Sequence, residues 1–535
     1  MEFDANDFPY ASRRAPVFAR NGVAAAGNPM AASVGLQVLL EGGNAIDAAV
    51  AMSFAQPLFE PSGNGLGSDA FALIYFEGKL YGLNGSGPSP RALTLELLKA
   101  RGMTEVPTYG PLSVDVPGAV DAWVQMQERF GTKTLEELTA PAVRYAREGF
   151  AVSPNIARLW EDAARKFSAM QPRETYAPFF ELFCPKGRAP KAGETFASEA
   201  MARTIEAIAR TAGRDFYEGE AAEKTAAFFR KVGGVLALED LAAYRAEWVE
   251  PISVNYRGYD VWEIPPNGHG ISVLMALNML KDMALSGRDE AATLHRQIEA
   301  MKLAMTDAAR HVTEPSAMRV KVAELLSESY AKRRAALIGE KALLPEPGDP
   351  SGPDTVYFCT ADRHGNMVSM IQSNYHGFGS GVVVPKTGIS MNNRAKNFVT
   401  DPGHVNVLAG GKRPYHTIIP GFITKDGEPV GPFGIMGGFM QPQAHVQVVQ
   451  NMIDFHLNPQ QALDAPRFQW VGGRKVQLEQ EFDNVTIRRL QKMGHEVEVI
   501  ADTVLMGRGQ VILRMDDGTY CAGTEKRTDG QVMAF

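Results

Sequence analysis

The chain has 535 residues, of which 45% are hydrophobic and 21% charged, and its formal charge at pH 7 is −7. This composition is typical of a globular protein, and the negative charge disfavours nucleic acid or anionic membranes as partners. The three cysteines lack CxxC spacing and the ten histidines lack HxH or HExxH pairs, so we expect no disulfide framework, no metal site and no cofactor. Residues 1–20 contain no apolar run of signal-peptide length and no segment is long enough for a membrane span, so we expect a cytoplasmic protein.

Two helices are predicted within residues 28–58. Asn28, which precedes a proline, can cap the first helix, and a Gly-Gly pair then interrupts the chain before Asn44, which can cap the second. The second helix has four alanines within residues 45–51, which indicates that it packs closely inside the protein.

Further elements follow in chain order. A glycine-rich turn at residues 63–67 precedes a predicted strand at residues 70–75. The turn lacks the spacing of a nucleotide-binding loop, so we interpret it as a packing turn. Helical patterns dominate residues 118–345, except for residues 248–264, which we expect to be extended.

A Pro/Gly/Asp-rich segment at residues 344–354 is unsuited to a helix or a central strand. It leads directly into two β-branched and aromatic runs joined by a turn at residues 363–366, which predicts a hairpin beginning at Thr355. These features mark a boundary within the chain, although by themselves they also fit a surface loop that precedes a sheet.

The last third of the chain holds the candidates for chemistry. Thr355 opens a strand just after the loop, and Arg394 follows a turn. The pair Gly437-Gly438 lets consecutive backbone N–H groups point in one direction, as an oxyanion hole requires. The common serine-hydrolase signatures GxSxG and SxxK are absent. Each candidate alone is more often structural, and it is their conjunction that favours a catalytic site.

The order of motifs along nearly the whole chain carries a family resemblance. The motifs are EGGNAIDAAVA (41–51), SGNGLGSDAFALIY (62–75), VDVPGAVDAW (114–123), DTVYFCTADRHGN (354–366), FGSG (378–381), GISMNNR (388–394), KRPYHTIIP (412–420), IMGGF (435–439) and DAPRF (464–468). Together they resemble the γ-glutamyltransferase family of N-terminal-nucleophile (Ntn) hydrolases. The runs SNYHGFGSG and NGSG are similar to the branch of that family that includes oxamate amidohydrolase.

The resemblance implies an α+β fold, the four-layer αββα sandwich of Ntn hydrolases, made of two chains formed by autoproteolysis. It places the cleavage between Asp354 and Thr355. Residues 1–354 would then form the large chain and residues 355–535 the small chain, associated in one composite domain. The expected partners are therefore the two chains of the precursor for each other and a small-molecule substrate. The resemblance does not decide whether the protein forms a homo-oligomer.

The resemblance also assigns catalytic roles. Thr355 falls on the family's nucleophile, and its α-amine, freed by cleavage, can serve as its base because such an amine titrates near neutrality. Ser373 falls where the family has a hydroxyl residue near the nucleophile. Gly437 and Gly438 fall on the pair whose N–H groups stabilise the tetrahedral oxyanion. The precursor is therefore expected to be inactive.

The family's contacts to the γ-glutamyl group differ most in this chain. The corresponding positions are occupied by Ser86, Gly87, Tyr375, Arg394, Asn397, His416 and Thr417. Asn397 replaces the aspartate that binds the substrate's α-amine, and Ser86 replaces an arginine. A pocket built from Arg394, His416 and Thr417 suits a small substrate with a carboxylate and no α-amine. Alternatively, Arg394 pairs with a protein carboxylate and the pocket binds a neutral molecule.

Three functions fit these residues. The first is a self-processing amidohydrolase that acts on a small, oxamate-like amide through a covalent acyl-Thr intermediate. The second is a γ-glutamyl hydrolase or transferase with a rearranged site, and whether water or an amine accepts the acyl group stays open. The third is a non-catalytic binding relative, which the joint presence of Thr355 and the glycine pair disfavours.

Overall fold

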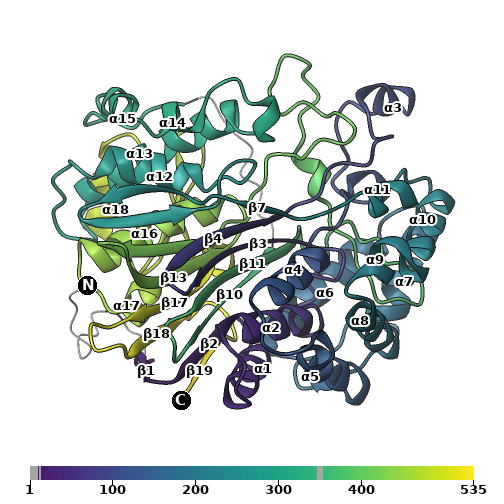
Figure 1. The fold of residues 1–535 in the computed structure, drawn as a ribbon. Coiled ribbons are helices and arrows are strands. Elements are labelled where there is room, and N and C mark those ends of the chain that lie inside the picture. Colours follow the sequence, from purple (N-terminus) through teal and green to yellow (C-terminus); the bar gives the residue numbers. More distant parts are fainter. Residues whose placement is uncertain (1–9, 11–13, 346–353) are drawn as a thin grey trace.

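The computed structural model describes Tyr10 and residues 14–345 and 354–535. Two large sheets stack face to face and helices cover both outer faces, which gives four layers (Figure 1). This is the α+β sandwich predicted from the sequence. Most of the predicted loop before Thr355, residues 346–353, lies outside the described residues.

Within the described part of the chain, each large sheet has seven strands. The first sheet consists, in spatial order, of β1 (Val17–Ala19), β18 (Tyr520–Thr524), β17 (Arg508–Arg514), β13 (Glu428–Met436), β12 (Gly421–Lys425), β9 (Tyr259–Glu263) and β8 (Ile252–Tyr256). The second consists of β19 (Gln531–Ala534), β2 (Gly22–Ala26), β10 (Asp354–Asp362), β11 (Met367–Tyr375), β3 (Asp69–Phe76), β4 (Lys79–Gly85) and β7 (Glu247–Val249). The predicted hairpin is β10–β11, at the centre of the second sheet.

The three central strands of the second sheet sort their side chains by alternation. Neighbouring residues along a strand point to opposite faces, and residues paired across antiparallel strands share a face. Phe71 and Ile371 belong to the apolar layer between the two sheets, whereas Ala72 and Met370 belong to the core under the helices. Odd-numbered residues of β3 and β11 therefore face the space between the sheets.

Helices of the N-terminal half lie on the outer side of the second sheet, three of them against its strands and the others packed around those three (Figure 1). They are α1 (Pro29–Leu40), α2 (Ala45–Phe59), α4 (Ala119–Phe130), α5 (Leu135–Glu148), α6 (Pro154–Ser168), α7 (Arg173–Phe183), α8 (Glu199–Thr211), α9 (Arg214–Glu218), α10 (Glu220–Lys231) and α11 (Leu238–Ala242), with α3 (Leu95–Ala100) further out. The two helices predicted within residues 28–58 are confirmed as α1 and α2. Asn28 and Asn44 cap them as expected, and every residue of α2 is buried.

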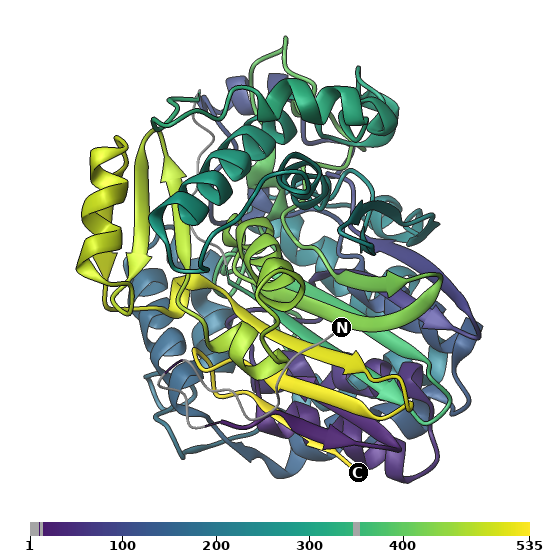
Figure 2. The same ribbon diagram turned by 90° about the vertical axis from the view of Figure 1, so that its left-hand side faces the viewer.

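The outer face of the first sheet packs against α12 (Ile271–Leu280) and α16 (Met440–Ile453), and α13 (Ala291–His311) packs on these two helices. The remaining helices on this side are α14 (Val322–Leu325), α15 (Glu328–Ala335), α17 (Pro459–Asp464) and α18 (Asn484–Lys492). Strands β14 (Phe468–Gly472), β15 (Lys475–Glu479) and β16 (Glu496–Ile500) form a small sheet that α18 flanks, at the left of Figure 2. Two short strands, β5 (Phe150–Ala151) and β6 (Thr195–Phe196), pair with each other. None of the helices in the described ranges is both long and apolar enough for a membrane span.

Candidate active site

Thr355 is the second residue of β10 and lies at an irregularity of the sheet. The register between β10 and β11 shifts between Asp354 and Val356, and such a bulge re-aims a side chain. The Oγ1 of Thr355 lies 3.0 Å from the Oγ of Ser373 on β11. Ser373 Oγ in turn accepts the backbone N–H of Tyr375 at 2.8 Å. The structure thus joins the predicted nucleophile and its predicted hydroxyl partner by a hydrogen bond.

The glycine pair Gly437-Gly438 follows β13 of the opposite sheet. Gly434 near the end of β13 packs on the ring of Tyr357, because a Cβ at Gly434 would lie 2.2 Å from that ring. Tyr357 is two residues from Thr355, and Gly434 is three residues from Gly437. The glycine turn and the nucleophile therefore lie at the same end of the sandwich, one on each sheet.

The backbone of the glycine turn directs an N–H group away from α16. Gly437 and Gly438 have φ values of 135° and 55°, in the region that favours glycine. The carbonyl of Gly437 accepts the N–H of Met440 at 3.0 Å. In a trans peptide the C=O of one residue and the N–H of the next point in opposite directions, so the Gly438 N–H faces away from the helix. The positive end of the α16 dipole adds to the field that an oxyanion would experience here.

A buried set of charged side chains continues from Ser373 across the sheet. Ser373 pairs with Asp69 in the β11–β3 ladder, so both side chains face the space between the sheets. Asp69 Oδ2 accepts a hydrogen bond from His416 Nε2 at 2.9 Å. We call the following residues the Arg394 cluster: Asp69, Asp115, Tyr375, Arg394, His416 and Thr417. All are buried, with at most 3% of their surface exposed.

Arg394 is only partly satisfied within this cluster. Its Nη1 donates to Thr417 Oγ1 at 2.7 Å, and its Nε lies 3.5 Å from Asp69 Oδ2. The guanidinium carbon stands 4.4 Å from the centre of the Tyr375 ring, as in a cation–π contact. Nη2 has no hydrogen-bond partner among the described residues. The alternative considered for Arg394, a protein carboxylate, is thus present at one nitrogen, while another nitrogen can still bind a ligand.

Burial sets the charge state of the cluster. Burial raises the pKa of Asp69 to about 7, although the positive charge of Arg394 opposes the rise. Burial and the same positive charge keep the pKa of His416 well below its usual value, so the imidazole is neutral. Burial also lowers the pKa of the Arg394 guanidinium. A titrating carboxylate therefore lies beside the arginine, and its state determines how much positive charge the cluster presents.

Asp115 is the least satisfied member of the cluster. Neither of its carboxylate oxygens has a hydrogen-bond partner in the described part of the chain. Burial and the negative charge of Asp69 raise its pKa well above the usual value, against the opposing effect of Arg394. Asn392 holds the two backbones together, because its Oδ1 accepts the N–H groups of both Asp115 and Arg394.

Two residues predicted to contact the substrate, Ser86 and Asn397, form hydrogen bonds to protein atoms in this structure. Ser86 is buried and its Oγ lies 2.6 Å from Asn84 Oδ1, to which it donates. The adjacent Gly87 N–H points at Asp69 Oδ1 from 3.4 Å, so this segment borders the cluster. Asn397 donates from Nδ2 to the Tyr415 carbonyl at 2.9 Å. Both residues shape the surroundings of the Arg394 cluster, and their roles toward a substrate stay predictions.

Comparison with known proteins places this geometry in a family. Residues 31–535 match the family model described as Gamma-glutamyltranspeptidase. The chain belongs to the γ-glutamyltranspeptidase family. It is 35% identical over 522 residues to the glutathione hydrolase-like YwrD proenzyme of Bacillus subtilis, covering 95% of this chain and 97% of that protein. It is 32% identical over 530 residues to the oxamate amidohydrolase proenzyme of Klebsiella pneumoniae, covering 96% and 98%.

A solved structure agrees with this assignment. The crystal structure of cephalosporin acylase from Bacillus halodurans matches with a TM-score of 0.96 and 54% identity, covering 100% of this chain and 99% of that one. The predicted family is therefore confirmed, as is its Ntn-hydrolase fold. The chain is an amide hydrolase of this family and, like its proenzyme relatives, self-processing.

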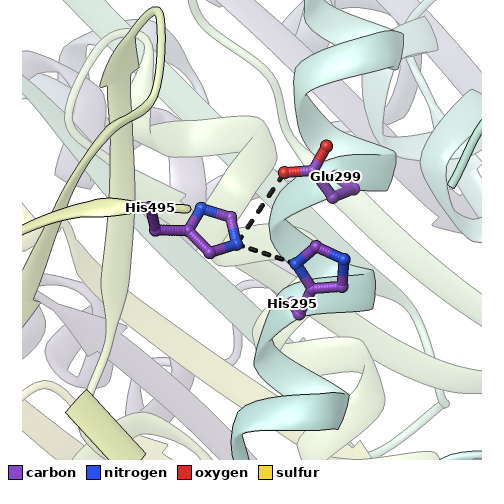
Figure 3. Close-up of side chains that lie close together, drawn as sticks. All are labelled: His295, Glu299 and His495. Carbon is purple, nitrogen blue, oxygen red and sulfur yellow. Dashed lines mark hydrogen bonds and ion pairs between the residues drawn. The ribbon is translucent and has the colours of Figure 1, made fainter. Parts of the chain in front are cut away.

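Another buried polar group lies away from the reaction centre. His295, Glu299 and His495 offer ligand atoms within 4.8 Å of one another (Figure 3). Within the group, His295 Nδ1 lies 2.8 Å from His495 Nε2, and Glu299 Oε1 accepts a hydrogen bond from Lys302 Nζ at 2.8 Å. The Lys302 ammonium therefore already pairs with the carboxylate of this group.

The same group holds the chain just before the predicted cleavage loop. His295 Nε2 donates to the Gly339 carbonyl at 2.8 Å, and Glu299 Oε2 accepts the Leu343 N–H at 2.8 Å. His495 belongs to the predicted small chain, whereas the other residues belong to the predicted large chain. We therefore interpret the group as a hydrogen-bonded contact between the two chains.

Sequence reasoning missed the two carboxylates of the Arg394 cluster. Asp69 is the only charged residue of the apolar strand β3, and Asp115 lies within the VDVPG run. A single carboxylate at the start of an apolar strand indicates a buried functional group, because a side chain on such a strand is shielded from water and a charge there is costly. Their proximity to Arg394 depends on strand register and on three distant segments, which the sequence does not show.

Proposed function

We propose that the mature enzyme hydrolyses amides whose short acyl group ends in a carboxylate and carries no α-amine. Thr355 is the nucleophile and Arg394 binds the substrate's carboxylate. The observation that supports this proposal is the arrangement of four side chains. Thr355 bonds to Ser373, Ser373 is paired with Asp69 on the same face of the sheet, and Asp69 lies beside Arg394. A substrate lying in this direction presents its carbonyl to Thr355 and its carboxylate to the guanidinium.

The reaction follows from the atoms present after cleavage. The freed α-amine of Thr355 takes the proton of its own hydroxyl while Oγ1 attacks the amide carbonyl. The oxyanion is stabilised by N–H groups of the Gly437-Gly438 turn, a contribution that is typically worth about 100- to 1,000-fold in rate. The C–N bond breaks and the amine leaves with that proton. Water then releases the acid and regenerates Thr355.

One pair of substrates tests the acyl preference. Glutaryl-p-nitroanilide and γ-glutamyl-p-nitroanilide share the leaving group and chain length and differ only in the α-ammonium. We expect the glutaryl compound to have the higher kcat/KM by about tenfold or more. Burial raises the pKa of Asp115 well above its usual value, so the protonated carboxyl leaves a buried ammonium without an anionic partner, which costs several kcal/mol. Equal efficiencies, or a preference for the γ-glutamyl compound, would overturn the proposal. Ammonia release from oxamate, succinamate and glutaramate then gives the preferred acyl length.

The second candidate is γ-glutamyl hydrolysis, which one observation favours. Asp115 has no partner for either oxygen among the described residues, and in its ionised form it would bind an α-ammonium. Under this alternative Asp115→Asn lowers kcat/KM for the γ-glutamyl compound alone. Under the proposed function the same variant affects both compounds equally.

A further inference from the structure

His269 is a fully buried imidazole beside the Arg394 cluster, and the function proposed above does not use it. It lies in the loop between β9 and α12. This loop pairs with the segment that carries two members of the cluster. The His269 N–H donates to the His416 carbonyl at 2.9 Å, and the His416 N–H donates to the Asn267 carbonyl at 2.9 Å. Two backbone hydrogen bonds thus hold His269 next to the cluster.

The His269 ring also reaches the residue that follows the glycine turn. Its centre lies 6.1 Å from the ring centre of Phe439 and 5.7 Å from that of Tyr415. Phe439 comes directly after Gly438 and is half-buried. In the proposed function the glycine turn holds the carbonyl end of the acyl group and Arg394 holds its carboxylate. His269 has neighbours at both places, so it borders the acyl chain between its two ends.

The ring nitrogens of His269 have hydrogen-bonding capacity that the protein leaves unused. Neither nitrogen makes a hydrogen bond within the described part of the chain. The Thr417 backbone acts on the ring electrostatically, but one backbone group satisfies only one of two nitrogens. A buried polar atom without a partner is costly, so such a position is normally filled by a ligand atom or a water. Because Arg394 Nη2 is also unpaired, one ligand that spans this region would satisfy both side chains.

The surroundings keep the His269 imidazole neutral. Burial above all, and then the neighbouring His416 and Arg394, lower the pKa of His269 to about 3, against the opposing effect of the Thr417 backbone. A neutral imidazole has one N–H donor and one nitrogen acceptor. It therefore suits a hydroxyl, which both donates and accepts, and it offers no countercharge to an ammonium.

We propose that His269 determines acyl specificity by binding a hydroxyl on the acyl chain, between the carbonyl that Thr355 attacks and the terminal carboxylate. The inference rests on the proposed function and narrows its substrate class to monoamides of hydroxylated dicarboxylic acids. A substrate without the hydroxyl leaves the imidazole unpaired, which is how a site built to bind a hydroxyl rejects the analogue that lacks it. The attack by Thr355 and the cleavage of the C–N bond are unchanged, and His269 transfers no proton.

Matched substrates test this role in the wild-type enzyme. The compounds 3-hydroxyglutaryl- and 3-methylglutaryl-p-nitroanilide share the leaving group, the chain length and the carboxylate, and they differ in one mid-chain group of similar size. With the enantiomers measured separately, we expect kcat/KM for the better hydroxy compound to exceed that of its methyl counterpart by about tenfold, the effect of one buried hydrogen bond.

Glutaryl-p-nitroanilide, measured alongside, separates this inference from the proposed function. If the glutaryl compound is hydrolysed and the hydroxy-to-methyl ratio is near one, water alone satisfies His269 and its role in specificity is overturned. If none of the three compounds is hydrolysed, the proposed acyl group itself is overturned.

Variants then assign the preference to His269. His269→Phe keeps an aromatic ring against Tyr415 and Phe439 but removes both nitrogens, so it should bring the hydroxy-to-methyl ratio close to one. His269→Leu is a second variant without nitrogens and should do the same, whereas His269→Gln keeps a donor and an acceptor and should retain part of the ratio. His364→Phe, in the exposed turn of the β10–β11 hairpin, is the matched control and should keep the wild-type ratio.

A wild-type ratio that persists in His269→Phe or His269→Leu would contradict the role of His269. The ratio is internal to each preparation, so a lower yield of folded or processed protein does not alter it.

Discussion

Two buried groups of charges in this protein contrast sharply in how fully they are paired. One is the Arg394 cluster, and the other, which we call the Arg467 network, consists of Arg467, Glu479, Glu525 and Arg527. Both bury arginines and carboxylates almost completely. In the Arg467 network, Arg527 bonds to both glutamates as well as to backbone carbonyls. In the Arg394 cluster, by contrast, guanidinium nitrogens and a whole carboxylate lack partners among the described residues.

The charge states follow from this difference. Glu525 has a pKa below its ordinary value, because the positive charges of Arg467 and Arg527 outweigh the effect of burial. Asp69 has a pKa raised to about 7, because burial outweighs the single arginine beside it. In the Arg467 network only the Nε of Arg467 lacks a hydrogen-bond partner among the described residues. Pairing this extensive keeps charges fixed and stabilises the fold, whereas less complete pairing leaves binding capacity for a ligand. The contrast predicts a structural role for the Arg467 network and a binding role for the Arg394 cluster.

The largest expected effect is on stability, from breaking the Arg467 network. Glu525→Gln should lower the free energy of unfolding by about 3–5 kcal/mol, because it leaves buried guanidinium charge uncompensated. Urea denaturation of the uncleaved chain, made in a Thr355→Ala background, measures this change. Glu220→Gln, which removes an exposed pair with Lys224, is the control and should change stability by at most about 1 kcal/mol. If Glu525→Gln lowers the free energy of unfolding no more than Glu220→Gln does, the contrast between the two groups is contradicted.

The next effect is on catalysis, from Arg394. Arg394→Lys and Arg394→Ala should each lower kcat/KM for glutaryl-p-nitroanilide by about 10- to 150-fold, the equivalent of roughly 1.5–3 kcal/mol. Lysine keeps the charge but loses the planar fork. Self-cleavage needs no substrate carboxylate, so denaturing gels should still show two bands. Loss of processing together with activity would instead assign Arg394 to the fold.

The smallest effect concerns pH and Asp69. Below pH 7 the carboxyl is neutral and Arg394 acts with its full charge; above pH 7 the carboxylate offsets it. The ratio of kcat/KM for glutaryl- over pentanoyl-p-nitroanilide should therefore fall by about 3- to 10-fold between pH 6 and 8. Titration of the Thr355 amine changes kcat/KM for both substrates by the same factor and therefore cancels in the ratio. Asp69→Asn should make the ratio independent of pH. A decline that persists in this variant would mean that another titrating group causes it.

Asp69→Asn should also change the free energy of unfolding, in the direction opposite to Glu525→Gln. An acid whose pKa is higher in the folded than in the unfolded state destabilises the fold once pH exceeds its unfolded value, here 3.8, and most fully above pH 7. Asp69→Asn should therefore raise the unfolding free energy at pH 8, whereas Glu525→Gln lowers it. A loss of stability in Asp69→Asn would mean that the ionised carboxylate is a structural partner of His416.

Much of the fold could be predicted from local signals. Asn28 and Asn44 cap their helices as expected, and the hairpin that begins at Thr355 turns where predicted, because caps and turns depend on neighbouring residues. The Arg394 cluster could not be assembled this way. Asp69 reaches Ser373 through a strand register, and Asp115 reaches Arg394 through the side chain of Asn392. Such contacts arise from packing between segments far apart in the sequence.

The central claim is that Thr355 becomes both the new N-terminus and the nucleophile. The most direct test is Edman sequencing of the small chain from purified wild-type protein, with Thr355→Ala prepared in parallel. We predict a small chain that begins Thr-Val-Tyr-Phe, and a Thr355→Ala protein that stays one inactive chain of 535 residues. Thr355→Ser should retain part of the self-cleavage and part of the amide hydrolysis, because serine keeps the hydroxyl and the free amine. A small chain with any other first residue, or a Thr355→Ala protein that still hydrolyses amides, would contradict the account.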